Sequence, residues 1–563
     1  MTEKKTYADK IWLKSYKLGQ FKLKKTLEPY PEMPIHKFLD DIIAEFPERP
    51  AILYKGRKIT YKQLKRDVDK FATALADLGV KKDDKVATIL PTSPQFVICD
   101  QAIHRLGAVH VPCSILHMES DLIHEIGESG AETIICLDTS LSRVNRIKDK
   151  TKLKNIIITS INDYTLKEPE VPKTTDAHQL RSLIEKYEPN LPHVEINPRE
   201  DVAELLFTGG TTGLPKGVML TNYNLTTNVF QFAHWIFQPL MISIKGKASV
   251  LVNPPCFHIY GHFLTHCCIS LGLRMLMVQD PRDIDEIAAL MKEYRPFLVA
   301  GVPTHYMRLL SKDLDKYQVF CFSGAAPLPP EVATKFEKKV GIPIGEAYGM
   351  TEMGPITHVN ISPFSKITGF MRSVKKASMG VPVPDTEVKI INLETGEEVP
   401  FGETGELYVR GPQLMKGYWP TPGKGITKDG WLATGDIGRM DEDGYFYIVD
   451  RIKDMINVSG YKVYSSLVDN VLFEHPAVEV AAAIGIPDPD RPGSERVKVF
   501  VQLKKDYVGK VTAEDIIKHC KEKLPPYSIP KFIEFRDDLP LTVSEKIFKK
   551  KLRDEEITKM KGN

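Results

Sequence analysis

Apolar residues in the first third of the chain alternate between two spacings. Residues 61–79 ("YKQLKRDVDKFATALADLG") place apolar side chains three or four positions apart and end at Gly79, and the short apolar run "KVATILP" follows. The same order recurs at 95–113 ("QFVICDQAIHRLG", "AVHVPC") and at 122–138, where "AETIICLD" follows a helical pattern. A helix followed by a short buried strand, several times over, predicts an α/β fold with helices on the faces of parallel sheets.

The pattern changes near Val383. Residues 387–411 and 441–451 show short alternating runs joined by glycine-bearing turns, which predict a small antiparallel unit. After "RIKDMINVSG" a mixed strand and helix pattern returns and indicates a compact α+β unit. A chain of 563 residues exceeds the size of a single core, so we expect two domains, 1–452 and 453–563.

The most apolar stretch, residues 249–278, is long enough to consider as a membrane span. Pro254, Pro255, three histidines and Arg274 interrupt it, so two buried strands around a helix explain it better than a transmembrane segment. The N-terminal residues are charged throughout and do not resemble a signal peptide. Eight cysteines in so long a chain favour a reducing compartment, so we expect a cytoplasmic protein in which Cys267 and Cys268 are buried structural thiols, not a redox pair.

Charge excludes one class of partner. Lys and Arg number 76 and Asp and Glu 73, which gives a net charge of +3. Binders of nucleic acid carry a concentrated basic field. We therefore expect no nucleic-acid partner.

The first candidate site is the glycine-rich stretch "LLFTGGTTGLPKGVML" at 205–220. Glycine lets backbone N–H groups approach an oxyanion closely, which favours a phosphate loop over an ordinary surface turn. A Walker loop needs a Lys that opens a helix and is followed by Ser or Thr. Here Pro215 precedes Lys216 and Gly217 follows it, which predicts a turn and a phosphate loop of another kind.

Six further motifs follow this loop in order: "PPCFHIYG", "FSGAAPL", "EAYGMTE", "ATGDIG", "DRIKDMINVSGYKV" and "LPLTVSEKI". The series resembles the adenylate-forming superfamily of acyl-CoA synthetases, peptide-synthetase adenylation domains and firefly luciferase, over essentially the whole chain. "IWLKSY" at 11–16 and the text after it look most like fatty-acid–CoA ligases. The resemblance implies a large N-terminal domain of two doubly wound α/β subdomains plus a β-barrel, and a small mobile α+β C-terminal domain.

The resemblance also implies a two-step reaction with ATP, Mg²⁺ and coenzyme A. A carboxylate attacks the α-phosphate of ATP and releases pyrophosphate, and a thiol then attacks the acyl-adenylate. Thr208 and Glu352 are expected to bind the metal, and Thr351 to act near the α-phosphate. The expected nucleotide-binding residues are Thr208, Gly209, Gly210, Thr211, Thr212, Gly213, Lys216, Gly324, Ala325, Ala326, Glu346, Ala347, Tyr348, Gly349, Met350, Asp436 and Arg451. Gly209 stands where relatives commonly have Ser, which removes one hydroxyl donor but keeps the backbone N–H.

His258 has two interpretations. A single His in an apolar stretch is usually a hydrogen-bonded core residue, whereas the resemblance puts it in the acyl pocket near the carboxylate. Amino-acid-activating relatives carry an Asp here to pair with the substrate ammonium, so His258 argues against an α-amino acid. The expected acyl pocket consists of Trp235, Phe257, His258, Tyr260 and Met350.

The C-terminal domain is expected to serve both half-reactions by reorienting about Lys453. In the resemblance Lys546 reaches the carboxylate and α-phosphate during adenylation, and Ser459, Gly460 and Tyr461 line the pantetheine tunnel. Lys549, Lys550 and Lys551 are expected to face solvent. Glu545 stands where relatives usually have Gly, and 463–470 lacks their Pro and Glu; the first change concerns the loop's backbone and not the charge of Lys546.

The sequence therefore predicts an AMP-forming acyl-CoA synthetase for a medium- or long-chain fatty acid. Two alternatives stay open: a ligase for a short hydroxy acid, and a carrier-loading acyl-adenylate ligase that does not use CoA. The expected partners are a carboxylic acid, ATP and CoA, and a homodimer stays open as well.

Overall fold

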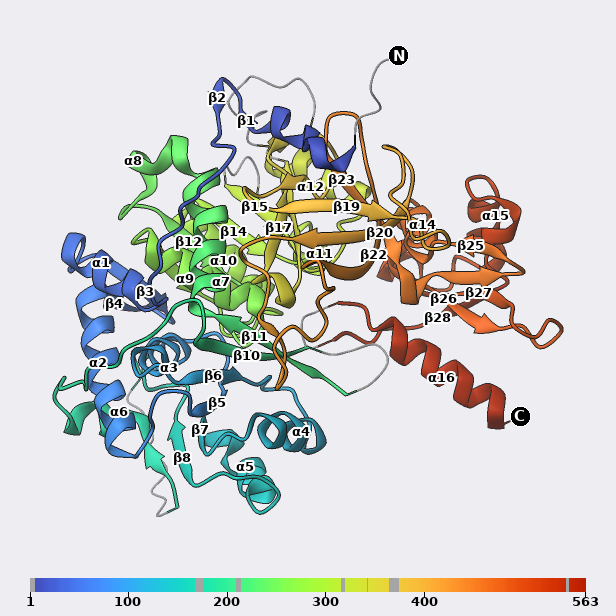
Figure 1. Ribbon diagram of the computed structural model, residues 1–563. Helices are drawn as coiled ribbons and strands as arrows, with labels where there is room; N and C mark the ends of the chain where they lie inside the picture. Colours follow the sequence, from blue (N-terminus) through green and yellow to red (C-terminus); the bar gives the residue numbers. More distant parts are fainter. Residues whose placement is uncertain are drawn as a thin grey trace.

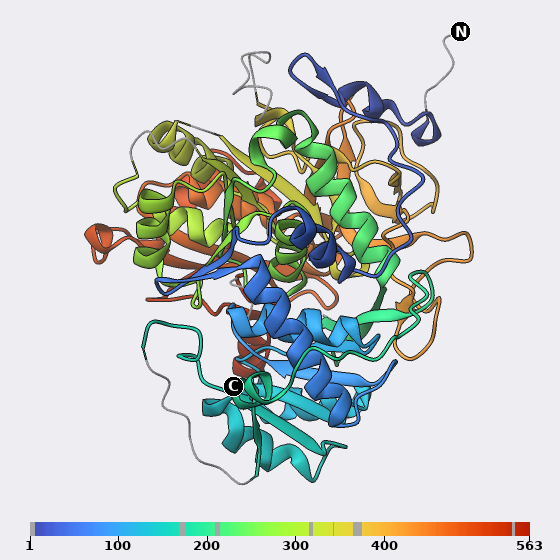
Figure 2. The same cartoon turned by 90° about the vertical axis from the view of Figure 1, so that its left-hand side faces the viewer.

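The computed structural model describes residues 6–167, 176–208, 214–314, 319–341, 343–363, 374–542 and 546–562 (Figure 1). Two large sheets form most of the molecule. Figure 2 shows the first, in light blue and teal with its helices, below the second, in green and yellow. In the described part of the chain no helix is both long and apolar enough to cross a bilayer.

The first sheet has eight strands in the order β21-β11-β10-β6-β5-β7-β8-β9. Its central strands are parallel, while β11 and β21 join one edge antiparallel to their neighbours. The strands are β5 (Lys85–Ile89), β6 (Val109–Pro112), β7 (Thr133–Leu137), β8 (Asn155–Thr159), β9 (His178–Gln179), β10 (Val202–Thr208), β11 (Lys216–Thr221) and β21 (Gly417–Tyr418). The associated helices are α2 (Tyr61–Asp77), α3 (Pro94–Arg105), α4 (Glu119–Ser129), α5 (Leu141–Lys148) and α6 (Leu180–Lys186).

Local signals explain why these helices begin where they do. The Thr60 side chain accepts from the Gln63 N–H at the start of α2, and the Ser93 side chain accepts from the Phe96 N–H at the start of α3, where Pro94 fits the first turn. The helix–strand alternation predicted from apolar spacing is confirmed at each of these places.

The second sheet has nine strands in the order β18-β17-β16-β15-β14-β12-β13-β3-β4. They are β3 (Pro50–Tyr54), β4 (Arg57–Thr60), β12 (Ser249–Val252), β13 (Arg274–Met277), β14 (Leu298–Gly301), β15 (Phe320–Ser323), β16 (Ile344–Gly349), β17 (Ile356–Val359) and β18 (Val381–Pro382). The helices in this part of the chain are α1 (Lys37–Glu45), α7 (Asn222–Val229), α8 (Met241–Ile244), α9 (Ile259–Ser270), α10 (Ile284–Tyr294), α11 (Pro303–Leu309) and α12 (Pro330–Val340). The apolar stretch 249–278 is β12, α9 and β13, as predicted, and all eight cysteines are free and buried.

The predicted antiparallel unit is a sheet with the strand order β19-β20-β22-β23. It is the part of the chain that corresponds to the β-barrel implied by the resemblance. Its strands are β19 (Glu387–Ile391), β20 (Gly405–Arg410), β22 (Leu432–Met440) and β23 (Phe446–Arg451). The N-terminal segment docks on this unit. Trp12 is buried edge-on against Phe446, 5.9 Å between ring centroids, and passes so close to Gly444 that a Cβ there would lie 2.4 Å from its backbone.

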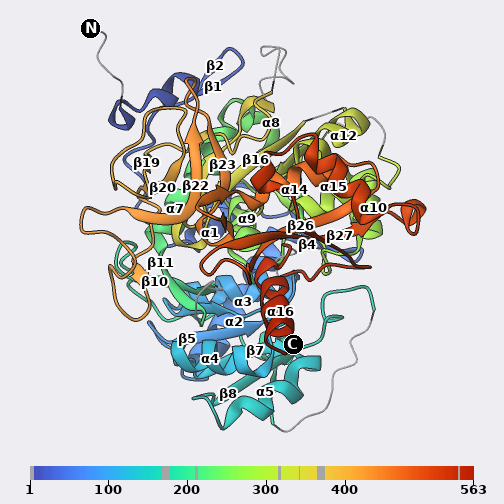
Figure 3. The same ribbon diagram turned by 90° about the vertical axis from the view of Figure 1, so that its right-hand side faces the viewer.

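The C-terminal unit packs α-helices on both faces of a small sheet, β26-β27-β28 (Figure 3). Its elements are β24 (Ile456–Val458), β25 (Tyr461–Val463), α14 (Ser465–Phe473), β26 (Val478–Pro487), β27 (Glu495–Leu503), α15 (Ala513–Lys521), β28 (Phe532–Phe535) and α16 (Lys549–Gly562). Neighbouring residues of β26 serve opposite faces, since Ala481 belongs to one apolar cluster and Ala482 to the other. The two-domain boundary itself, at 452–453, stays a prediction.

One expectation about this unit is wrong. Lys549 does not face solvent: its Nζ lies 2.6 Å from the Asp469 carboxylate and donates to the Ser465 hydroxyl at 2.8 Å. Both partners come from the 463–470 segment that departs from relatives. Lys550 and Lys551 are exposed, as expected.

Candidate functional site

The glycine-rich stretch connects two antiparallel strands. Thr208 ends β10 and faces Lys216, which begins β11, and the Thr208 hydroxyl donates to the Lys216 carbonyl at 3.4 Å. Lys216 thus opens a strand and not a helix, which agrees with the argument against a Walker loop. The predicted Gly209, Gly210, Thr211, Thr212 and Gly213 lie outside the described residues.

The predicted adenine side follows β15 and β16, which are parallel neighbours in the second sheet. Gly324 and Ala325 come directly after β15, and Ala325 has a positive φ of 69°. A Cβ on Gly324 would lie 3.3 Å from the Tyr260 ring, so this turn packs closely against the start of α9. Glu346, Ala347, Tyr348 and Gly349 form the end of β16, and partial burial raises the pKa of Glu346 to about 8.

A polar chain joins this strand to the antiparallel sheet. The Tyr348 hydroxyl donates to one Asp436 oxygen at 2.7 Å, and Arg451 Nε donates to the other at 2.9 Å. Asp436 and Arg451 are register partners in β22 and β23. Burial and the Asp436 charge raise the pKa of Tyr348 well above its usual value, so the phenol stays a donor. The carboxylate has further lone pairs for ligand hydroxyls.

The predicted metal-binding region lies just beyond, where Met350 leads into the turn Thr351–Met353. One Glu352 oxygen accepts from the Tyr418 hydroxyl at 2.8 Å, and the Lys216 ammonium lies 5.1 Å from the centroid of the Tyr418 ring. Tyr418 thereby connects the phosphate-loop lysine with the predicted metal ligand, a role that no motif signalled. Glu352 and Thr208 offer oxygen donors only, which is the set that Mg²⁺ prefers.

His258 caps the N-terminus of α9. Its Nδ1 accepts from the Tyr260 N–H at 3.2 Å, which leaves the proton of the neutral ring on Nε2. Burial, reinforced by the nearby charge of Lys546, lowers the pKa of His258 to about 3. The ring is therefore a neutral donor at physiological pH, and the core-residue and pocket interpretations are compatible.

Lys546 reaches this group from the C-terminal domain. Burial, followed by the Arg451 charge, lowers the pKa of Lys546 to about 8, while the charge of Asp436 opposes the shift. Its backbone is fixed to Thr542 by two hydrogen bonds of 2.7 and 3.2 Å across residues 543–545, which lie outside the described residues and include Glu545. Residues 258, 436, 451 and 546, remote in sequence, are thus brought together.

The predicted acyl-pocket residues have different environments. Trp235 is fully buried, donates its indole N–H to the Lys24 carbonyl at 2.9 Å and packs edge-on against Tyr16. Phe257 is buried, and Tyr260 donates its hydroxyl to the Phe322 carbonyl at 3.2 Å. The Trp235 contacts tie it to the N-terminal segment; its acyl-pocket role stays a prediction.

The predicted pantetheine loop is exposed. Ser459 has a positive φ of 52° and its hydroxyl accepts from Arg491 at 3.0 Å. Tyr461 is 59% exposed and stacks on Tyr527, with ring centroids 4.7 Å apart. Lys453 lies in the short helix Ile452–Asp454 that connects this unit to β23.

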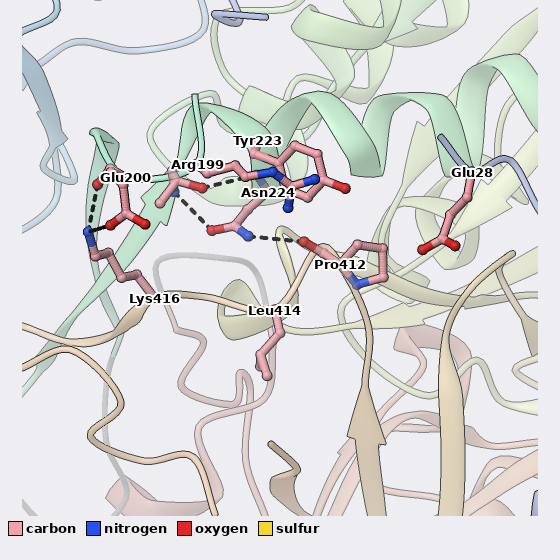
Figure 4. Close-up of a pocket in the computed structure, with 9 residues that line it drawn as sticks. Glu28, Arg199, Glu200, Tyr223, Asn224, Pro412, Leu414 and Lys416 are labelled. Atoms are coloured by element: carbon pink, nitrogen blue, oxygen red, sulfur yellow. Dashed lines mark hydrogen bonds and ion pairs between the residues drawn. The ribbon is translucent and has the colours of Figure 1, made fainter. Parts of the chain in front are cut away.

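A separate surface pocket of about 560 Å³ lies near the start of α7 (Figure 4). Three of its charged side chains already have partners: Arg199 lies over the Tyr223 ring at 3.9 Å, and Lys416 contacts Glu200 at 2.9 Å. The pocket lining includes none of the predicted site residues, and we assign it no role in the reaction.

Comparison with known proteins agrees with the family resemblance that the motifs carry. Residues 39–419 match the family model of the AMP-binding enzyme, and residues 467–546 match the AMP-binding enzyme C-terminal domain. The chain is 36% identical to a long-chain-fatty-acid–CoA ligase of Bacillus subtilis (94% of this chain, 95% of that protein). It is 34% identical to a protein of the same name from Haemophilus influenzae (98% and 99%).

Among solved structures, ATP-bound MatB from Rhodopseudomonas palustris superposes with a TM-score of 0.81 at 25% identity, covering 93% of this chain and 99% of that one. The apo structure of the same protein gives a TM-score of 0.71. The arrangement seen here is thus closer overall to the ATP-bound form of that relative.

Proposed function

Because the chain belongs to the family of AMP-binding enzymes, we propose that it is an ATP-dependent acid–CoA ligase whose substrate is a medium- or long-chain fatty acid. The fatty-acid carboxylate attacks the α-phosphorus of ATP. The bond from that phosphorus to the oxygen that bridges the α- and β-phosphates breaks, and pyrophosphate leaves. The CoA thiolate then attacks the acyl carbonyl and expels AMP. The chain-length class rests on the names of the relatives and on the large apolar residues expected around the acyl group.

The observation that carries the proposal is the position of Lys546 near His258, Asp436 and Arg451. Adenylation forces two anions together, the carboxylate and the α-phosphate. An ammonium between them stabilises the charge that accumulates there, and a neutral His258 Nε2–H can donate to the carboxylate without repelling the Lys546 ammonium. Asp436, held by Tyr348 and Arg451, is oriented to accept from the two ribose hydroxyls.

Thr208 and Glu352 would hold Mg²⁺, whose chemistry is to neutralise charge on the ATP phosphates. Lys216 and the predicted backbone donors of 209–213 would bind the β- and γ-phosphates. After adenylation, we propose that rotation at Lys453 withdraws Lys546 and brings Ser459, Gly460 and Tyr461 to the acyl-adenylate. The lower TM-score of the apo relative supports such a change between arrangements.

The second candidate is a carrier-loading ligase that makes the same acyl-adenylate but does not use CoA. Supplying CoA or an acyl-carrier protein to the purified enzyme and measuring the thioester by mass spectrometry separates the two. Thioester with CoA alone supports the first proposal; thioester with the carrier alone would replace it. We further propose a cytoplasmic location, supported by eight free buried cysteines.

Chain length tests the substrate class directly. Each methylene buried in an apolar pocket contributes about 0.8 kcal/mol, which corresponds to about fourfold in kcat/KM. From acetate to hexanoate we therefore expect kcat/KM to rise by about 200-fold. The measurement is a coupled assay of AMP release across a series of straight-chain acids.

A panel that includes short 2- and 3-hydroxy acids and an amino acid serves as the control. A maximum at acetate, at a hydroxy acid or at an amino acid would contradict the aliphatic assignment. If kcat/KM rises with chain length and then levels off, the length at which it levels off gives the depth of the pocket, because the gain per methylene ends where the pocket ends.

The lowered pKa of Lys546 predicts a loss of adenylation at alkaline pH. The ammonium is present below a pKa of about 8 and is lost as the pH rises through that value. We expect kcat/KM for ATP–pyrophosphate exchange, which reports the free enzyme, to fall above pH about 8. The fall in kcat, which reports the enzyme–substrate complex, should occur at a higher pH, because the bound anionic substrates favour the charged form of Lys546.

Lys546→Arg is the matched control, since a guanidinium stays charged throughout this range. The exchange activity of this variant, whatever its level at neutral pH, should not fall above pH about 8. The exchange assay contains no CoA, so ionisation of the thiol cannot produce the effect. A wild-type profile that stays flat to pH about 10 would contradict this role for Lys546.

A further inference from the structure

A group of buried titratable side chains includes none of the predicted catalytic residues. Asp100 and His104 are one helical turn apart on α3, His262 and His266 are one turn apart on α9, and Glu204 is on β10. Each offers one donor atom, and the five atoms lie within 4.8 Å of one another. The exposed fraction of every member is 2% or less.

The carboxylate of Asp100 is surrounded by imidazoles. Its Oδ1 lies 2.9 Å from His104 Nε2 and 2.7 Å from His262 Nε2, and its Oδ2 lies 3.0 Å from His266 Nε2. His110 approaches Oδ1 from another side at 2.9 Å while its other nitrogen contacts the Thr88 hydroxyl at 2.8 Å. The Gln101 amide donates to Oδ2 at 3.0 Å, so His110 and Gln101 together orient Asp100.

Within the described part of the chain, hydrogen bonds do not account for two members of the group, His104 and Glu204, and the Glu204 carboxylate is the costlier of the two. Both of its oxygens are buried and, among the described residues, neither has a hydrogen-bond partner. The nearest cationic candidates are His262 Nε2 at 3.4 Å and His104 Nε2 at 3.8 Å. A buried carboxylate without a partner is costly, and a second carboxylate beside it adds repulsion. A bound cation would remove both costs.

We propose that Asp100, His104, Glu204, His262 and His266 bind one divalent transition-metal ion, zinc by preference. Three imidazoles with carboxylates form a donor set typical of zinc and of its neighbours in the first transition series. Metal–ligand bonds of about 2.0–2.2 Å put the donor atoms of a tetrahedral site roughly 3.3–3.6 Å apart. The donor pairs given above are 2.7–3.8 Å apart and all five donors lie within 4.8 Å, so small side-chain movements would bring four of them to that spacing.

The position indicates a structural role. The α9 helix connects β12 to β13 of the second sheet, whereas β10 and the neighbours of α3 belong to the first. An ion held by all three elements would cross-link the two α/β units. It would also fix the elements that carry two predicted active-site residues, because α9 begins next to His258 and β10 ends at Thr208. The burial of the group implies that the ion enters during folding.

The proposal is tested on full-length protein made in zinc-supplemented medium and purified without a metal-affinity column. Elemental analysis should give about one zinc ion per chain. The double variant His262→Gln/His266→Gln should retain less than about a tenth of that and melt at a lower temperature. His305→Gln, which replaces another buried, hydrogen-bonded histidine outside the group, should keep its zinc.

A spectroscopic measurement on the wild-type chain guards against a double variant that fails to fold. Protein produced with cobalt(II) in place of zinc should show the visible d–d absorption of a low-coordinate site, and Glu204→Gln should change that spectrum. Wild-type protein with no bound transition metal and no cobalt spectrum would overturn the proposal, and Glu204 would then carry a proton instead. Equal zinc in the wild type and a folded double variant would overturn it too.

Discussion

Replacing Lys546 by Ala is expected to lower ATP–pyrophosphate exchange by about 10²–10³-fold. The lysine is the cation brought by the C-terminal domain to His258, Asp436 and Arg451, where two anions must meet. The second half-reaction starts from the acyl-adenylate, whose carbonyl is neutral and already activated. In our proposal, domain rotation has by then withdrawn Lys546 from the site. Thioester formation from synthetic acyl-adenylate should therefore stay within about tenfold of wild type.

Lys551→Ala is the matched control, because Lys551 is exposed in the same basic segment. Lys549 cannot serve, since it contacts Asp469 and Ser465 and its loss would leave the largely buried Asp469 carboxylate without its cationic partner. If Lys551→Ala lost exchange while Lys546→Ala kept it, the adenylation lysine would have been assigned to the wrong position.

Lys453→Pro is expected to separate the two half-reactions in the opposite sense. Lys453 lies in a 3₁₀ helix, whose φ values include the one that proline fixes, so the arrangement seen here remains accessible. Rotation away from it is hindered. We expect exchange to stay within about threefold of wild type and thioester formation to fall by about 100-fold, measured by single-turnover assays of each step.

Lys453→Ala, which removes the charge but not the backbone freedom, is the control and should retain both steps. The proline ring also disfavours a helical conformation at Ile452, so the melting temperature of the proline variant must be compared with wild type. Equal loss of both half-reactions in a folded protein would mean that the backbone at 453 does not act as the hinge.

The parts of the fold that the sequence predicted depend on local patterns. Helices such as α2 and α3 carry their own apolar spacing and caps, and a buried strand follows each from a short apolar run. The motif order supplied the candidate site for a different reason: its residues resemble a family whose fold brings them together.

What the sequence did not reveal are contacts between distant positions. Nothing near Tyr418 predicts its bond to Glu352, and nothing near Lys549 predicts its pairing with Asp469. The buried group around Asp100 left a partial signal, since Asp100 and His104, and likewise His262 and His266, stand four residues apart. That spacing becomes informative only when α3 and α9 are known to face the same strand.

His258 caps its helix in addition to the acyl-pocket role proposed for it, and this has an evolutionary consequence. The amino-acid-activating members of the superfamily that this chain resembles carry Asp at this position, and Asp is among the best N-capping residues. An exchange of His for Asp would therefore preserve the start of α9 while replacing a neutral donor by an anion. A substitution at position 258 alone could thus change the class of acid that is activated without a loss of fold, which makes this position a natural point of divergence among these enzymes.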